Sequence, residues 1–262
     1  MSETTRAANK VAQVNLAFWV MKICATTLGE TAGDLLSMTL NVGYAISSII
    51  LLGLFLISLV TQLMSRSFHP ALYWTVILTT STAGTTMSDF MDRTLGLGYA
   101  TGSLILVTCL ALVLAVWRVT QKSLSVSRID TPRAELFYWI AILVSNTLGT
   151  ALGDYLADDS GLGFLGGAAL IAGLIAAVVV LTYTTRLDRV MLFWIAFVLT
   201  RPFGATFGDL LTKPAENGGL DFGTIGSSLV LVSILVVLIV FTSVRSKPVH
   251  HSSRLPAPGE QR

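Results

Sequence analysis

Four aspartates recur in this chain at a fixed distance from a tryptophan, within segments that are otherwise apolar. Each lies fifteen residues after its tryptophan and directly follows a glycine or a serine; they are Asp34, Asp89, Asp154 and Asp209. Carboxylates are costly inside a membrane and commonly mark ion or proton pathways there. Carboxylate oxygens are ligands for protons and hard cations. The four aspartates therefore predict a site for a small cation or a proton.

Two further charges lie deeper in the same kind of segment. Glu30 precedes Asp34 by one helical turn, and Arg201 lies eight residues before Asp209 in the equivalent segment of the fourth unit. Each charge would cost about 2.5–3.5 kcal/mol if left unpaired near the middle of a membrane. We therefore expect Glu30 and Arg201 to approach each other across the interior, either as part of a binding site or as a purely structural ion pair.

Hydroxyl groups could complete an oxygen-rich site. Thr27, Thr82 and Thr147 each lie eight residues after a tryptophan, on the same helical face as the acidic residues. The expected substrate-binding set comprises these threonines, the carboxylates and Arg201. The expected metal ligands are the carboxylates alone: Glu30, Asp34, Asp89, Asp154 and Asp209. A bound divalent cation or a coupled proton is conceivable, and no other cofactor is expected.

The segments that must position these residues have the length and composition of membrane helices. The chain of 262 residues is 53% hydrophobic and only 12% charged, well below the charge content of soluble domains. Eight apolar segments of roughly twenty residues can be distinguished, each long enough to cross a bilayer. They lie near 14–34, 44–63, 71–90, 98–118, 134–155, 163–183, 189–210 and 223–243. The sequence predicts an all-α polytopic membrane bundle with eight transmembrane helices.

The eight segments form four repeats of two. Trp19, Trp74, Trp139 and Trp194 each follow an aromatic residue and open the pattern [FY]W-x9-G-x3-[GS]-D. A unit with two spans preserves orientation, so the repeats are parallel. The first and third tryptophans are 120 residues apart, and so are the second and fourth. This equality suggests that a half made of two repeats was duplicated. The expected divisions are a tail (1–13), repeats at 14–63, 70–118, 133–184 and 189–243, a linker (119–132) and a disordered tail (244–262).

Glycines and aromatic residues in the repeat have simpler interpretations. Small residues four apart allow helices to approach closely, so a packing role is expected for Gly29, Gly33, Gly84, Gly149, Gly153, Gly204 and Gly208. The tryptophans are interpreted as an aromatic belt at the inner membrane surface, with the floor of a cavity as the alternative. Lys22, three residues after Trp19, is expected to extend to the aqueous boundary.

The distribution of positive charge predicts the topology. Thirteen lysines and arginines lie in the two tails and in alternate connections, whereas the remaining connections hold only Arg93 and Lys213. The positive-inside rule then places both termini in the cytoplasm.

The repeated tryptophan, glycine and aspartate pattern resembles a family of bacterial membrane-anchored proteins built of four tandem repeats, each with two spans and a tryptophan. The resemblance covers about residues 14–243 and implies an architecture and a bacterial inner membrane, but no activity. The fourth unit departs from the others: it reads "TRPFG" at 200–204 and has an insertion around "KPAEN" at 213–217.

Three functions remain compatible with these residues. The first is transport of a small cation, for example manganese or magnesium, through an acidic central cavity. The second is transport of an organic anion or zwitterion bound by Arg201, and the third is a membrane scaffold or sensor without transport. No metalloprotease, serine-nucleophile or phosphate-loop motif is present, so no enzyme is expected. The expected partners are the lipid bilayer and a small cation, with no nucleic acid.

Overall fold

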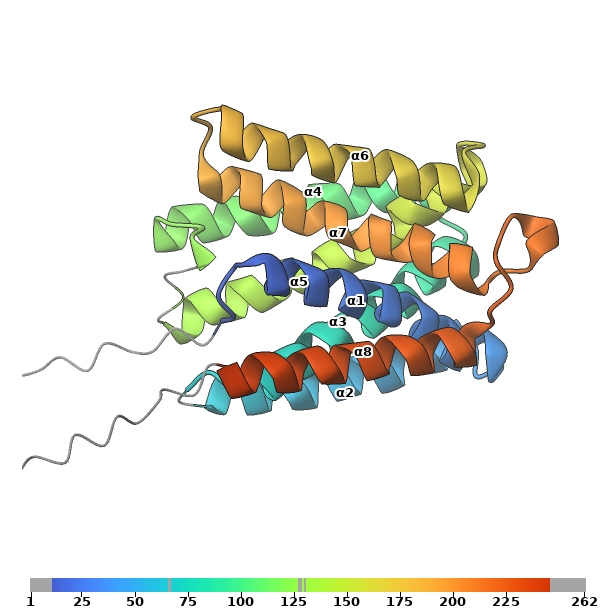
Figure 1. Cartoon of the computed structure of the whole chain (residues 1–262), viewed down its shortest axis with the longest axis horizontal. Coiled ribbons are helices and arrows are strands. Elements are labelled where there is room, and N and C mark those ends of the chain that lie inside the picture. Colours follow the sequence, from blue (N-terminus) through green and yellow to red (C-terminus); the bar gives the residue numbers. More distant parts are fainter. Residues whose placement is uncertain (1–10, 66, 127–128, 130, 246–262) are drawn as a thin grey trace, which may run out of the picture.

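The computed structural model describes residues 11–65, 67–126, 129 and 131–245, and this part of the chain is helical without any strand. Eight long helices lie side by side along one axis (Figure 1). They are α1 (Leu16–Asp34), α2 (Tyr44–Met64), α3 (Pro70–Asp89), α4 (Tyr99–Gln121), α5 (Pro132–Asp154), α6 (Gly163–Thr184), α7 (Arg189–Thr212) and α8 (Thr224–Arg245). The predicted all-α bundle of eight helices is confirmed.

Local sequence explains where the inner helices begin. The side chains of Asn15, Thr131 and Asp188 accept hydrogen bonds from backbone N–H groups in the first turns of α1, α5 and α7. Pro70 and Pro132 open α3 and α5, where a missing N–H has no cost. These starts fix the register of each inner helix and so the depth of its polar residues.

The first three inner helices continue past their aspartate into one wider π-helical turn. These turns are η1 (Leu35–Thr39), η2 (Phe90–Thr94) and η4 (Tyr155–Asp159). The fourth repeat has no such turn after Asp209; its inserted residues form a loop that contains a short 3-10 turn, η5 (Ala215–Asn217). The sequence did not reveal these π-helical turns.

The odd-numbered helices form a closed inner ring, in which α1 and α5 each contact both α3 and α7. The even-numbered helices lie outside this ring, with α4 and α6 on one side of it and α2 and α8 on the other (Figure 1). Each outer helix packs mainly on the inner helix of the next repeat: α2 on α3, α4 on α5 and α6 on α7. The last outer helix, α8, packs on α1 and closes the circle.

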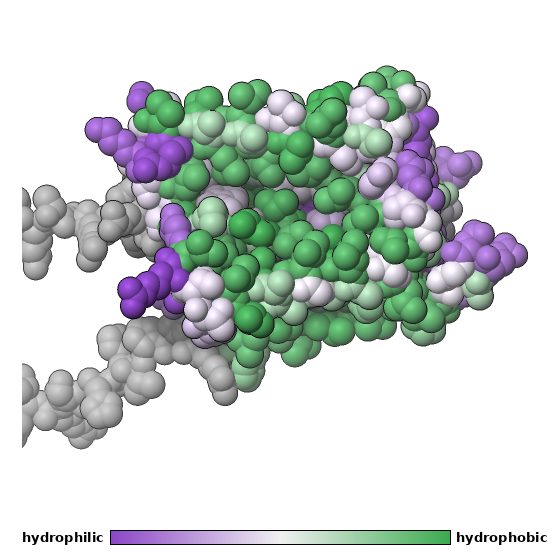
Figure 2. Space-filling view, turned by 90° about the horizontal axis from the view of Figure 1, so that it is seen from above, coloured by the Kyte–Doolittle hydropathy of each residue, from purple (hydrophilic) through white to green (hydrophobic). Residues whose placement is uncertain are grey.

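The outside of the bundle is suited to lipid. Six segments are long and apolar enough to cross a membrane, namely α2, α4, Pro132–Asp159, α6, α7 and α8. Of the eight expected spans, α1 and α3 do not meet this measure, because their many threonines, serines and charged residues lower their hydropathy. Most of these polar residues are buried in the bundle. Figure 2 shows a broad hydrophobic surface between polar residues at the two ends. These apolar helices indicate a membrane protein.

Glycines allow the inner helices to pack closely, in a pattern that repeats around the ring. A Cβ atom added to Gly29 would collide with Ser81, one on Gly84 with Asn146, one on Gly149 with Arg201, and one on Gly204 with Thr26. Each glycine therefore faces the same position of the next repeat, and the fourth faces the first. These matched contacts also show that the inner helices run parallel.

Gly84→Ala is expected to lower the free energy of unfolding by about 1–3 kcal/mol, because overpacking forces the backbones apart. The new Cβ would lie 2.9 Å from the backbone carbon of Asn146 and from the backbone nitrogen of Thr147. Gly53→Ala on α2 is the matched control, since its Cβ would meet nothing within 4 Å. Denaturant unfolding in detergent compares the two variants. An equal effect of both would contradict the packing role of Gly84.

The tryptophans were predicted to form an aromatic belt at the inner membrane surface, with the floor of a cavity as the alternative, and their burial contradicts the belt. Trp74, Trp139 and Trp194 are buried. The aromatic residue before each tryptophan packs on the tryptophan of the next repeat, with ring centroids 5.6–6.4 Å apart: Phe18 on Trp74, Tyr73 on Trp139, Tyr138 on Trp194 and Phe193 on Trp19. Because these residues fill the ring interior, they close one end of the bundle, which we call the tryptophan end.

Candidate functional site

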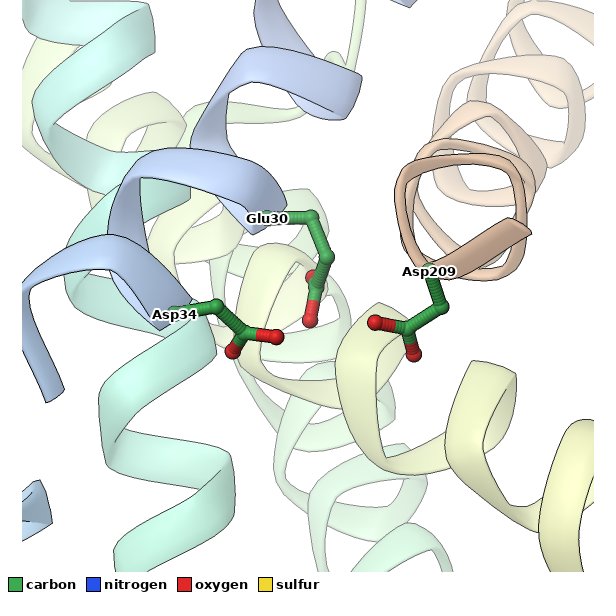
Figure 3. Close-up of side chains that lie close together, drawn as sticks. All are labelled: Glu30, Asp34 and Asp209. Atoms are coloured by element: carbon green, nitrogen blue, oxygen red, sulfur yellow. The ribbon is translucent and has the colours of Figure 1, made fainter. Parts of the chain in front are cut away.

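The recurring spacing of acidic residues brings carboxylates together at the opposite end of the inner ring, which we call the carboxylate end. Oxygens of Glu30, Asp34 and Asp209 all lie within 4.8 Å of one another. Figure 3 shows these side chains pointing toward one another, two from α1 and one from α7. All three are buried, with at most 4% of their surface exposed. Such a group of oxygens could hold a hard cation.

Glu30 and Arg201 form a buried ion pair, which confirms their predicted approach. The Nη1 atom of Arg201 lies 2.9 Å from Glu30 Oε2, and both side chains are almost fully buried. Arg201 Nη2 also donates hydrogen bonds to the hydroxyls of Thr85 and Thr150. Each of these hydroxyls in turn donates to Glu30 Oε2, at 3.2 Å. The pair is therefore held by residues from all four inner helices.

The four aspartates are bridged in pairs by two cations. Lys213 Nζ lies 2.7 Å from Asp34 Oδ2 and 3.2 Å from Asp209 Oδ1. Arg93 lies 3.1 Å from Asp89 and 3.4 Å from Asp154. The two cations occupy equivalent positions in the two halves of the chain, since each follows an aspartate by four residues and they are 120 residues apart. Each links an aspartate of its own repeat to one of a neighbouring repeat.

These bridging cations stay charged. Burial alone would lower the pKa of Lys213, but the carboxylates of Asp209 and Asp34 outweigh it, and the resulting pKa is well above that of a free lysine. The pKa of Arg93 is likewise raised, with Asp89 and Asp154 outweighing burial. A raised lysine pKa stabilises the fold at all pH values below the unfolded pKa, and this contribution is lost only as pH rises through the folded pKa. Lys213 therefore keeps its positive charge between Asp34 and Asp209 at physiological pH.

The bridging cations also separate the carboxylates from the exterior. The side chains of Lys213 and Arg93 are 20% and 30% exposed, whereas the aspartates that they bind are only 3–5% exposed. At the other end, the aromatic packing closes the ring. The carboxylates therefore lie between the aromatic packing at the tryptophan end and the long basic side chains of Lys213 and Arg93.

The three threonines that were expected as ligands form hydrogen bonds within their own helices. The hydroxyls of Thr27, Thr82 and Thr147 donate to the carbonyls of Ile23, Leu78 and Leu143 in their own helices. The hydroxyls that bind Glu30 belong instead to Thr85 and Thr150, three residues further along. Both positions lie on the helical face of the acidic residues, since they align with Glu30 in the repeat.

Lys22 does not extend to the aqueous boundary, and that expectation is wrong. Its side chain is fully buried, its Nζ lies 4.2 Å from the centre of the Phe197 ring, and no hydrogen-bond acceptor reaches it in the described part of the chain. The aromatic residues around the first turns of the inner helices block its path outward. Lys22 therefore places a buried amine inside the ring, against the face of Phe197.

Comparison with known proteins identifies the repeat. The family model described as "Repeat of Unknown Function (DUF347)" matches residues 17–68, 72–123, 137–188 and 192–247. These four matches confirm the predicted four tandem repeats, with two helices in each. No curated protein and no solved structure matches the chain.

Proposed function

The chain belongs to the DUF347 repeat family, whose description assigns no activity, and from the geometry of the carboxylate end we propose that the protein transports a small cation. The observation that carries this proposal is the convergence of five buried carboxylates from four repeats. Three cations contact them directly: Arg201, Arg93 and Lys213. With all eight side chains ionised their net charge is 3 − 5 = −2, so the cluster can accept further positive charge.

The ammonium of Lys213 supports a specific mode of binding. It lies between two carboxylates, in contact with both, as a bound cation would. A substrate cation entering from the carboxylate end would displace Lys213 and take the oxygens of Asp34, Asp209 and Glu30. Carboxylates suit magnesium and manganese, so a divalent cation fits this donor set once Lys213 has moved away. Lys213 would return when the cation leaves.

The membrane side follows from charge. The bias of lysine and arginine toward the tails and alternate connections supports a bacterial inner membrane protein with both termini in the cytoplasm. The carboxylate end then faces the periplasm and the tryptophan end faces the cytoplasm. Transport would require the aromatic packing at the tryptophan end to open after the cation has bound.

An organic anion is less well supported as the substrate. Arg201, the residue that would bind it, is neutralised by Glu30 and donates to two threonine hydroxyls. Such an arginine would have to break a buried pair before it could bind a carboxylate.

Uptake into proteoliposomes tests the proposal. A panel of cations that includes Mn²⁺ and Mg²⁺ is offered to the wild type, to Asp34→Asn and to Asp159→Asn. We expect uptake of at least one cation by the wild type, and its loss by about tenfold or more in Asp34→Asn, since a charge-assisted contact contributes about 1.5–3 kcal/mol. Asp159→Asn is the matched control, because Asp159 is an exposed aspartate after the same type of helix. Absence of uptake of every cation by folded wild type would instead favour a scaffold or sensor.

A further inference from the structure

A groove outside the inner ring, near the tryptophan end, has the features of a lipid site. It has a volume of about 570 Å³ and lies between α4, the start of the following linker and the first half of α7. It exists because α4 packs on α5 and α6 packs on α7, so that no outer helix fills the space between α4 and α7.

The wall of the groove is apolar. It is formed by Leu114 of α4 and by five residues of α7, namely Val190, Met191, Ile195, Val198 and Leu199. Met191 and Ile195 remain 46% and 40% exposed. Both helices are among those apolar enough to span a membrane, so this wall is at a depth where lipid chains are available.

Two cations lie at one end of this wall. Arg118 and Lys122 line the groove, and both are exposed. Arg118 donates to the Lys122 carbonyl at 2.7 Å, and Lys122 ends α4 in a left-handed conformation with φ of 57°. Within the described part of the chain neither forms an ion pair. The acid in the groove, Asp188, accepts a hydrogen bond from the backbone N–H of Val190 as the cap of α7.

The linker is fixed beside the groove. The indole N–H of Trp194 donates to the carbonyl of Leu124 at 3.0 Å, and Trp194 packs edge-on against Trp117 of α4. The groove is therefore bounded by residues that are held in place. Its arrangement, two cations above an apolar wall, matches an anionic phospholipid, which carries a phosphate above acyl chains.

We propose that this groove binds one anionic phospholipid, with its phosphate on Arg118 and Lys122 and an acyl chain along Val198 and Leu199. Positive charge at this end attracts the anionic lipids of the adjacent leaflet, and the apolar wall selects a lipid over a soluble phosphate. The site is independent of the carboxylate end, so its presence does not depend on cation transport.

Lipid titration of the full chain in neutral detergent tests this site. Phosphatidylglycerol and phosphatidylcholine with the same acyl chains are added, and binding is followed by native mass spectrometry. We expect phosphatidylglycerol to bind on the order of 25-fold more tightly, at roughly fivefold for each cation. R118Q combined with K122Q should remove this preference, whereas R133Q, which alters an exposed arginine outside the groove, should retain it.

A second variant tests the acyl-chain part of the site without changing charge. Val198→Trp fills the groove and should reduce binding of both lipids, while gel filtration and circular dichroism check that the variant is folded. Equal affinity for the two lipids, or a preference that persists in the double variant, would overturn the proposal. Binding of inorganic phosphate alone with the same dependence on Arg118 and Lys122 would also overturn the proposal. So would a stable dimer whose interface covers the groove.

Discussion

Replacing Arg201 with leucine is expected to lower the free energy of unfolding by about 3–5 kcal/mol, because it leaves Glu30 as an unpaired charge in the interior. The arginine also donates to Thr85 and Thr150, so two hydroxyls lose a donor at the same time. Denaturant unfolding of the purified protein in detergent measures the change. Arg186→Leu is the matched control, since Arg186 is an exposed arginine in the connection before the same helix.

Removal of both charges should be much milder than removal of one. Glu30→Gln combined with Arg201→Leu leaves no buried charge at this position, and we expect it to recover more than half of the lost stability. Exchange of the two charges, Glu30→Arg with Arg201→Glu, should likewise be better folded than either single change. If the exchanged variant is no more stable to unfolding than either single variant, the ion pair does not stabilise the fold as its geometry implies.

Lys213→Met is expected to raise the affinity for a divalent cation by roughly thirty-fold, the equivalent of about 2 kcal/mol for one charge-assisted competitor. The lysine occupies the space between Asp34 and Asp209, so its removal frees both carboxylates. Calorimetric titration with Mn²⁺ measures the effect.

Two variants control this experiment. Lys213→Arg keeps a positive charge at the position and should bind Mn²⁺ no more tightly than the wild type. Lys213→Met combined with Asp34→Asn removes a ligand as well and should lose the gain. Equal affinities of Lys213→Met and Lys213→Arg would show that Lys213 does not compete with a cation.

Much of the architecture could be predicted from spacing alone. The recurring tryptophan, glycine and aspartate identified four repeats of two helices, and the 100° step of a helix placed the polar residues on one face. Because charges in an apolar protein must find partners, the Glu30–Arg201 pair could be inferred without coordinates. The repeats and the polar face depend only on positions within a helix, whereas the ion pair follows from the cost of leaving either charge unpaired in an apolar interior.

The other contacts between repeats could not be predicted in the same way. An aromatic pair at the start of a helix suits both a lipid-facing belt and a packed interior, and the sequence does not say which neighbour it meets. The same applies to Arg93 and Lys213, which were identified only as exceptions to the charge bias. Their bridging role depends on which repeats are adjacent. The 120-residue interval between them was the available signal.

Helix geometry explains why threonines other than the expected ones contact Glu30. A residue eight positions after the tryptophan and one eleven positions after it differ by about 60° around the helix axis. Thr85 and Thr150 occupy the later position, near the middle of the inward face, and contact Glu30. Thr27, Thr82 and Thr147 occupy its edge, where their hydroxyls bond to their own helices.

The packing of α8 on α1 has a consequence for biosynthesis. Among these eight helices α1 is synthesised first, yet it receives its outer neighbour only when α8 has been made. The two helices are joined by contacts such as the hydrogen bond between Ser228 and Thr31. Until then, the circle of helices in the nascent chain is open, and α1 lacks the outer helix that packs on it. Completion of the circle must therefore await the synthesis of α8, whatever the order in which the earlier hairpins enter the bilayer.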